Sequence, residues 1–201
     1  MAPPSESAPD GPRATPELYH SSAGVDALVL DPLADLLDGD PPPVVELEAS
    51  ASGRMPEPYR RLLVHHRDMT STLEHFHGEP SVLEVLAHRE DARRLLRKVL
   101  LRGRDSGHIQ EFGAIRIELD RFASEPRRAI LEGRTPLGAI LARHSVSYRS
   151  RPQRFFAIRC EGELCRRLGH ADDGFLFGRR NLLVGDEGTL AEVVEILPPT
   201  R

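Results

Sequence analysis

The sequence predicts an α+β fold that contains an antiparallel sheet, and three observations lead to this prediction. Residues 95–103 and 110–119 are two apolar strands joined by the turn residues of 104–108, which is typical of a β-hairpin. Residues 181–184 and 192–197 form a second pair of strands around a Gly-Asp-Glu-Gly turn. Between the strands lie short segments with helix start and stop signals. Hairpins of this kind pair neighbouring strands in antiparallel fashion.

The first 60 residues hold 11 of the 17 prolines, and they are predicted to lie mostly outside the core. Residues 1–22 are expected to form a disordered Pro/Ser-rich tail, because they offer little apolar surface to offset the entropy of ordering. Residues 23–54 are expected to form a helix and a linker. Apolar residues recur there at helical spacing between positions 25 and 37, and Pro32 bends or divides the helix.

Residues 55–199 carry the remaining elements. A helix is expected at 71–78, since Ser71 and Glu74 have capping-box spacing and Gly78 is a natural stop. Thr135 is the expected N-cap of a second helix that extends to residue 144. The other expected elements are strands at 82–87 and 153–159, a helical turn at 89–95, a helical or irregular segment at 121–131 broken by Pro126, and a turn at 178–180.

Composition narrows the classes of function. The chain has 201 residues, with 27 basic and 31 acidic side chains and a formal charge of -4, so nucleic acid is not expected as a partner. The N-terminus lacks the basic and apolar regions of a secretion signal, and no apolar run is long enough to span a bilayer. With only two cysteines, Cys160 and Cys165, the chain is expected to be a cytoplasmic protein without a membrane partner.

The segment 95–103 places a charge where folding alone would not require one. In a strand, Arg97 shares its face with Val99 and Leu101, so its guanidinium is expected to point inward. Glu195 is its acidic counterpart, because it shares a face with Val193 and Leu197 in another strand. Desolvating either charge requires a partner. Two interpretations therefore stay open: a structural salt bridge between Arg97 and Glu195, or opposite ends of a small-molecule pocket.

Other candidate chemistries have weaker support. Five residues between 65 and 77 invite a metal hypothesis, but their spacing matches no known zinc motif, and no metal is expected: His65, His66, Glu74, His75 and His77. The arginine-rich segment 143–167 is interpreted as a solvated basic face or as an electropositive rim that attracts an anion. Arg179 and Arg180 are further candidates for contacting an anion or a nearby acid. No serine lies in a nucleophile-elbow context.

The order of several motifs resembles the chorismate pyruvate-lyase family, which makes 4-hydroxybenzoate. The motifs are Asp68-Met69-Thr70, Arg97-Lys98-Val99-Leu100-Leu101, Thr135-Pro136-Leu137-Gly138, Phe177-Gly178-Arg179-Arg180 and Glu195-Ile196-Leu197-Pro198. The resemblance covers about residues 55–199. It implies a single α+β domain with a mainly antiparallel sheet of about six strands, helices packed on it, and a ligand buried beneath helical flaps.

The resemblance also implies roles for individual residues. Arg97 would bind a carboxylate, the backbone of Leu137 would contact it, Glu195 would bind a ring hydroxyl, and Met69 would line the pocket. The implied reaction eliminates pyruvate from chorismate to give a hydroxybenzoate without a cofactor, with Glu195 and Arg97 as the catalytic residues. Such a precursor would serve ubiquinone or secondary metabolism. A divergent member could also take another aromatic or cyclohexadiene carboxylate.

A second function is predicted from the same pocket. The fold also occurs in the ligand-sensing domains of transcription regulators, so fold alone does not establish catalysis. The alternative is a non-catalytic module that binds or senses a small aromatic carboxylate. No helix-turn-helix segment is evident in the sequence. The lyase is the leading expectation, and the binding module is its competitor.

Overall fold

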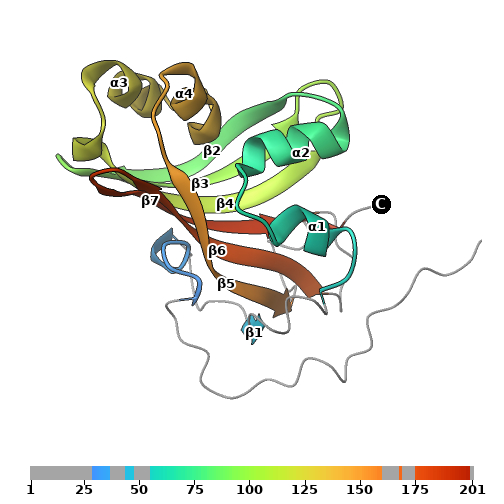
Figure 1. Cartoon of the computed structure of the whole chain (residues 1–201). Coiled ribbons are helices and arrows are strands. Elements are labelled where there is room, and N and C mark those ends of the chain that lie inside the picture. Colours follow the sequence, from blue (N-terminus) through green and yellow to red (C-terminus); the bar gives the residue numbers. More distant parts are fainter. Residues whose placement is uncertain (1–28, 37–43, 48–54, 160–167, 169–174, 200–201) are drawn as a thin grey trace, which may run out of the picture.

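Seven antiparallel strands form one sheet in the order β1-β5-β6-β7-β4-β3-β2 (Figure 1). This computed structural model describes residues 29–36, 44–47, 55–159, 168 and 175–199. The strands are β1 (Val44–Leu47), β2 (Ser81–Glu90), β3 (Arg94–Gly103), β4 (Ile109–Glu118), β5 (Arg149–Arg159), β6 (Phe175–Gly185) and β7 (Gly188–Leu197). The prediction of an α+β fold with a mainly antiparallel sheet is confirmed, and β1 adds one strand to the six expected.

Both predicted hairpins are present. β3 and β4 pair around the turn after Gly103, with Leu100 opposite Phe112. β6 and β7 pair around the turn that Gly185 and Gly188 close, and Gly188 has the positive φ of 121° that favours glycine there. β4 then pairs with β7, which joins the two hairpins into one continuous sheet.

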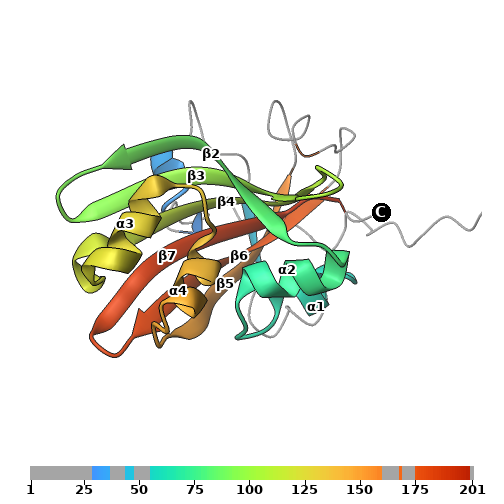
Figure 2. The same ribbon diagram turned by 90° about the horizontal axis from the view of Figure 1, so that it is seen from above.

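Helices cover one face of this sheet (Figures 1 and 2). They are α1 (Tyr59–Leu63), α2 (Met69–His77), α3 (Ser124–Glu132) and α4 (Leu137–Arg143), with short 3-10 turns η3 (Ala34–Leu36) and η5 (Leu119–Arg121) elsewhere. α3 and α4 pack over one half of the sheet with Ile117 and Ile130, and α1 and α2 pack over the other half with Leu73. A cavity lies on this face of the sheet, beside the first residues of α2 and α4.

The opposite face of the sheet is covered by residues 29–36. Leu33 is fully buried there against strand residues such as Phe156 and Ile196. The ammonium of Lys98 donates to the carbonyl of Leu36 over 3.0 Å, whereas Arg97 points to the helix-covered face. Strand alternation therefore predicts correctly that Arg97 and Lys98 lie on opposite faces.

Local capping explains where α2 begins and ends. The carboxylate of Asp68 accepts a hydrogen bond of 2.7 Å from the backbone N–H of Ser71, so the helix starts three residues before the predicted cap. The predicted cap at Ser71 is therefore wrong. Gly78 ends the helix in the left-handed conformation, at φ 71°, as predicted. This start places Asp68 and Met69 at the cavity.

The structure corrects five other local predictions. Residues 89–95 form no helical turn, because the side chain of Asp91 accepts from Arg93 and Arg94 and closes the β2–β3 hairpin. Pro126 lies in the first turn of α3, where its missing N–H costs no helical bond, so it does not break the segment. α4 starts after Pro136, so Pro136 takes the N-cap position expected for Thr135.

The predicted turn at 178–180 is instead the middle of β6. Glycine is needed at position 178 for close packing, since a Cβ atom there would lie 2.6 Å from the carbonyl oxygen of Glu195. The predicted helix before residue 37 is reduced, within the described residues, to η3. Pro32 accounts for this, because it lacks an N–H and disfavours helical backbone at Asp31.

Several predictions lie outside the described residues. They concern the tail at 1–22, much of the segment 23–54, Cys160 and Cys165, and Arg166 and Arg167 of the arginine-rich segment. Among the helices that the structure describes, none has the length and apolar character needed to cross a bilayer.

Candidate ligand-binding site

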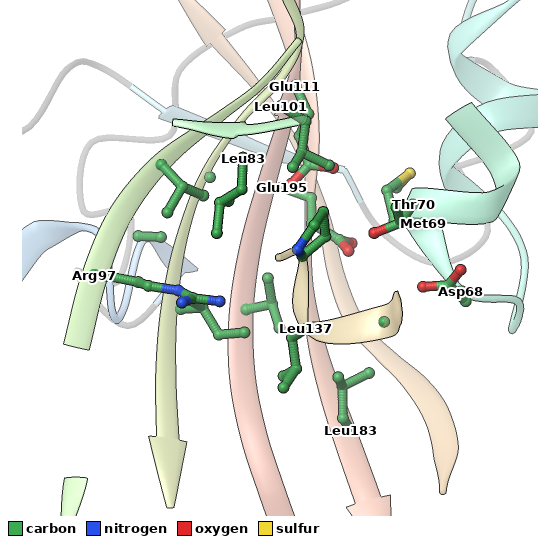
Figure 3. Close-up of a pocket in the computed structure, with 17 residues that line it drawn as sticks. Asp68, Met69, Thr70, Leu83, Arg97, Leu101, Glu111, Leu137, Leu183 and Glu195 are labelled. Carbon is green, nitrogen blue, oxygen red and sulfur yellow. The ribbon is translucent and has the colours of Figure 1, made fainter. Parts of the chain in front are cut away.

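A cavity lies between the helix-covered face of the sheet and the first residues of α2 and α4 (Figure 3). Its floor comes from β3, β4 and β7, and its sides come from Asp68, Met69 and Thr70 on one side and Pro136, Leu137 and Gly138 on the other. The space open to the centres of water-sized spheres is about 70 Å³, which is room for several waters or one small organic molecule. The cavity therefore has the location and size of a small-molecule site.

Arg97 enters this cavity as a buried cation. Its side chain is 2% exposed, and its only hydrogen bond among the described residues is a long one of 3.4 Å from Nη1 to the carbonyl of Ile130. The Nε donor has no partner there, and no described carboxylate pairs with the guanidinium. Burial lowers the pKa of Arg97 to about 10. A desolvated guanidinium of this kind favours an anion from outside the chain.

Glu195 lines the same cavity but already has a cationic partner. Its carboxylate accepts a hydrogen bond from Nε of Arg179, whose side chain is fully buried. Nη1 of Arg179 also donates to the backbone carbonyls of Leu63, at 2.9 Å, and His65, at 3.0 Å. The predicted alternative of a salt bridge between Arg97 and Glu195 is therefore wrong. Arg179 forms the buried ion pair, and Arg97 faces the cavity alone.

Glu111 is a cavity residue that sequence reasoning missed. Its side chain is buried, and its Oε2 atom has no hydrogen-bond partner among the described residues. Desolvation raises its pKa well above the usual range, and the nearby carboxylates of Glu195 and Asp68 raise it further, while Arg179 opposes this. A signal existed in the sequence. Strand alternation places Glu111 on the same face as the apolar residue Ile115, which also lines the cavity.

Apolar side chains fill the space between the charged groups. Met69 and Leu137, both predicted to line the site, do lie at the cavity, together with Leu83, Val99, Leu101, Ile115, Leu183 and Val193. Figure 3 shows Arg97 entering from one side of the cavity, while Glu111, Glu195 and Asp68 lie on the other side. The site thus has a cationic end, an apolar middle and an acidic end. This arrangement can hold a short molecule that carries a different polar group at each end.

Arg180 does not line the cavity. Its guanidinium donates to Glu192 over 2.9 Å and to the carbonyl of Asp31 over 3.0 Å. Arg116 joins the same network through Asp31 and Asp35, and the hydrogen bond from Arg116 holds the pKa of Asp31 below its usual range. This network ties residues 29–36 to the sheet, so the geometry gives Arg180 a structural position.

Two histidines of the segment 65–77 share hydrogen bonds with backbone carbonyls, His65 with Leu62 and His66 with Ser150 on β5. His65 shares a hydrogen bond of 2.7 Å with the carbonyl of Leu62, and its other ring nitrogen accepts from the backbone N–H of Arg67. Burial lowers the pKa of His65 to about 4, and the charge of Arg179 lowers it in the same direction. Within the described ranges, no cluster of three or more His, Cys, Asp or Glu residues has the geometry of a metal site.

An open groove adjoins the cavity at Asp68. It is lined by His66, Tyr148, Arg149, Ser150 and Arg151 as well, so the exposed arginines of β5 stand beside one side of the site. Burial raises the pKa of Tyr148 to about 12, and the carboxylates of Asp68 and Glu195 act in the same direction. Two residues of the arginine-rich segment, Arg149 and Arg151, therefore lie at this groove.

Comparison with solved structures identifies the fold. PhnF from Mycobacterium smegmatis matches with a TM-score of 0.52 at 10% identity, over 68% of this chain and 65% of PhnF. The effector domain of the same protein matches with a TM-score of 0.53 at 11% identity, over 67% of this chain and 90% of that domain. The ligand-binding domain of a protein described as a GntR-family transcriptional regulator from Bordetella bronchiseptica gives a TM-score of 0.44 at 11% identity, over 58% and 85% of the two chains.

No family model matches the sequence, and no curated protein matches it. The leading expectation of a lyase is contradicted, because a solved structure that shares this fold over about two thirds of the chain is described as an effector domain. The chain spans slightly less than two thirds of the length of PhnF and most of its effector domain. The chorismate-lyase-like fold predicted from the motifs is confirmed, and the effector domain of PhnF has a similar fold.

Proposed function

We propose that this domain is a non-catalytic effector-binding module whose ligand is a small organic carboxylate. One observation carries the proposal: Arg97 is 2% exposed, lines the cavity, and has no carboxylate partner among the described residues. A ligand carboxylate would provide the paired acceptors that a guanidinium binds best. The likeness to the effector domain of PhnF supports a binding role over catalysis.

The apolar middle of the cavity supports a compact hydrocarbon body for this ligand. Val99, Ile115, Leu137 and Val193 surround the space between the charged ends. Such surfaces favour a ring or short chain, because burying apolar ligand area is favourable and non-directional. An aromatic carboxylate of the size of benzoate is the simplest probe that satisfies both the cationic end and the apolar walls.

Isothermal titration calorimetry with benzoate and its neutral isostere benzamide tests this proposal. We expect the purified protein to bind benzoate with a dissociation constant of about 1 mM or tighter, and benzamide at least about tenfold more weakly. Arg97→Met should abolish this preference. Arg94→Met is the matched control, because Arg94 lies on the same strand but is exposed and pairs with Glu118.

Three outcomes would contradict the proposal. Equal binding of benzoate and benzamide would show that the cavity does not select a carboxylate. Unchanged benzoate binding by the Arg97→Met variant would place the anion elsewhere. Release of pyruvate from chorismate by the wild-type protein would contradict the non-catalytic role, and mass spectrometry of the incubation mixture measures it directly.

A further inference from the structure

Acidic residues outnumber basic residues in the lining of the cavity. Three carboxyl residues line the cavity, namely Asp68, Glu111 and Glu195, and Arg97 is the one basic lining residue within the described part of the chain. Arg179 neutralises Glu195 from outside the lining. The carboxylate of Asp68 accepts a hydrogen bond from a backbone N–H in the first turn of α2, where a negative charge is favoured. Glu111 is left without a compensating cation.

Glu111 is also the group that points into the cavity without a partner. Its side chain is 5% exposed, and its Oε2 atom makes no hydrogen bond among the described residues. Gly113, two residues along the same strand, keeps the space beside it open, since a Cβ atom there would lie 2.9 Å from Oε1 of Glu111. A buried carboxyl with an unused oxygen beside an open space is arranged to meet a ligand atom.

We propose that the ligand is zwitterionic, with its carboxylate at Arg97 and an ammonium group at Glu111. This inference rests on the proposed function and names the class of ligand that the same cavity selects. A protonated amine is the group that complements the acidic end, because an ammonium carries donors and no acceptor. Its positive charge would compensate the carboxylate of Glu111 in a site where water is largely excluded.

The charged groups around Glu111 explain why an amine is preferred to a hydroxyl. Glu195 on β7 and Asp68 before α2 disfavour a second negative charge at Glu111, and Arg179 on β6 is already engaged by Glu195. Tyr148, which precedes β5, is an uncharged neighbour of the same carboxylates. Without a cation, Glu111 is favoured in its protonated form, whereas a bound ammonium lets it ionise. Binding of an amine should therefore release a proton from Glu111, and binding of a hydroxyl should not.

A pair of probes of equal length tests the inference. We would titrate the wild-type protein with 4-(aminomethyl)benzoate and 4-(hydroxymethyl)benzoate, which differ only in an ammonium or a hydroxyl group opposite the carboxylate. The amine should bind about tenfold or more tightly than the alcohol. Its binding enthalpy should also change with the ionisation enthalpy of the buffer, because a proton is released to the buffer, and the enthalpy of the alcohol should not change in this way.

Two variants assign the effect to Glu111. Glu111→Gln keeps the shape of a protonated carboxyl but cannot ionise, so the amine and the alcohol should bind equally and the buffer dependence should vanish. Glu118→Gln is the matched control, because Glu118 lies on the same strand, is partly exposed and pairs with Arg94. It should keep the full preference for the amine.

The outcomes separate this inference from the proposed function. Arg97-dependent binding of benzoate without any preference for the amine in the wild-type protein would overturn the zwitterion and leave the carboxylate site intact. Binding of benzoate with no binding of either longer probe would also overturn it, since the cavity would then lack room for the second group. Loss of all Arg97-dependent binding would overturn the proposed function itself.

Discussion

Replacing Arg97 with methionine should leave the ligand-free protein at least as stable as the wild type. The burial that lowers the pKa of Arg97 from its ordinary value to about 10 corresponds to about 3 kcal/mol of lost solvation. The substitution removes this cost and keeps most of the apolar stem. It loses the hydrogen bond of 3.4 Å to Ile130, worth about 1 kcal/mol. The carbonyl of Ile130 still accepts from the N–H of Gly133. We expect a net gain of about 1 to 2 kcal/mol.

Arg179→Met should have the opposite effect on the stability of the ligand-free protein. Arg179 is fully buried and holds Glu195 and the carbonyls of Leu63 and His65. Removing one partner of such a pair leaves an uncompensated buried carboxylate, which costs about 3 to 5 kcal/mol. Adding Glu195→Gln to Arg179→Met should recover part of this loss, because the unpaired charge is then absent.

Urea unfolding of the ligand-free variants at neutral pH measures both effects. The free energy of unfolding should fall strongly for Arg179→Met and rise slightly for Arg97→Met. A loss for Arg97→Met as large as that for Arg179→Met would refute the reasoning, since it would show that Arg97 stabilises the fold and that its position at the cavity is incidental. Arg94→Met should change the stability by about 1 kcal/mol or less, as expected for an exposed pair.

Three further predictions concern the residues around this site. Glu111→Gln should stabilise the ligand-free protein increasingly as the pH rises above about 4.5. The pKa of Glu111 is raised in the folded protein, so folding of the wild type then requires uptake of a proton, which the glutamine variant does not need. Urea unfolding over a pH series measures the difference in the free energy of unfolding between the two proteins. The lowered pKa of His65 should reduce the stability of the wild type as the pH falls from about 6.5 through about 4, since a charged ring would place a second N–H against Arg179. His65→Gln should flatten this part of the profile, and an unchanged profile would contradict the assignment. Gly113→Ala should weaken benzoate binding, because its Cβ atom would lie 2.9 Å from Glu111 Oε1 and 3.1 Å from the carbonyl of Val194. Calorimetry measures the affinity of the variant for benzoate. An affinity equal to that of the wild type would argue against a ligand on this part of the cavity floor.

Strand alternation was enough to predict which charged residues point toward the cavity. Arg97 and Glu195 both line it, as their apolar neighbours at two-residue spacing indicated. Alternation does not give the order of strands in the sheet. β4 lies between β3 and β7, so Arg97 and Glu195 are not cross-strand neighbours. β6 lies beside β7 with Arg179 directly opposite Glu195, and this register forms the ion pair.

The position of Arg179 within a strand was not predicted, because the glycine before it indicated a turn. Gly178 next to two arginines is typical of a turn, yet here glycine serves close packing within β6, where a Cβ atom would meet the ring of Phe156 at 2.5 Å. Such a contact depends on a residue distant in sequence, and a local pattern cannot reveal it. Glu111 was different, because strand alternation puts it on the same face as the apolar residue Ile115 of the same strand. That residue could have been predicted.

Burial and pairing together separate the structural charges from those available to a ligand. Within the described residues, four buried side-chain polar atoms lack a hydrogen-bond partner, on Arg97, Gln110, Glu111 and Arg179. Arg179 is nevertheless anchored by three other acceptors, and Gln110 bonds to Ser81 through its carbonyl oxygen. Arg97 is a cation and Glu111 is a carboxyl group that a bound cation would ionise. Both line one cavity, and neither has an ionic partner among the described residues. Buried polar atoms left without partners by chance would not be expected to lie in the same cavity. A ligand with two charged ends would provide a partner for both residues.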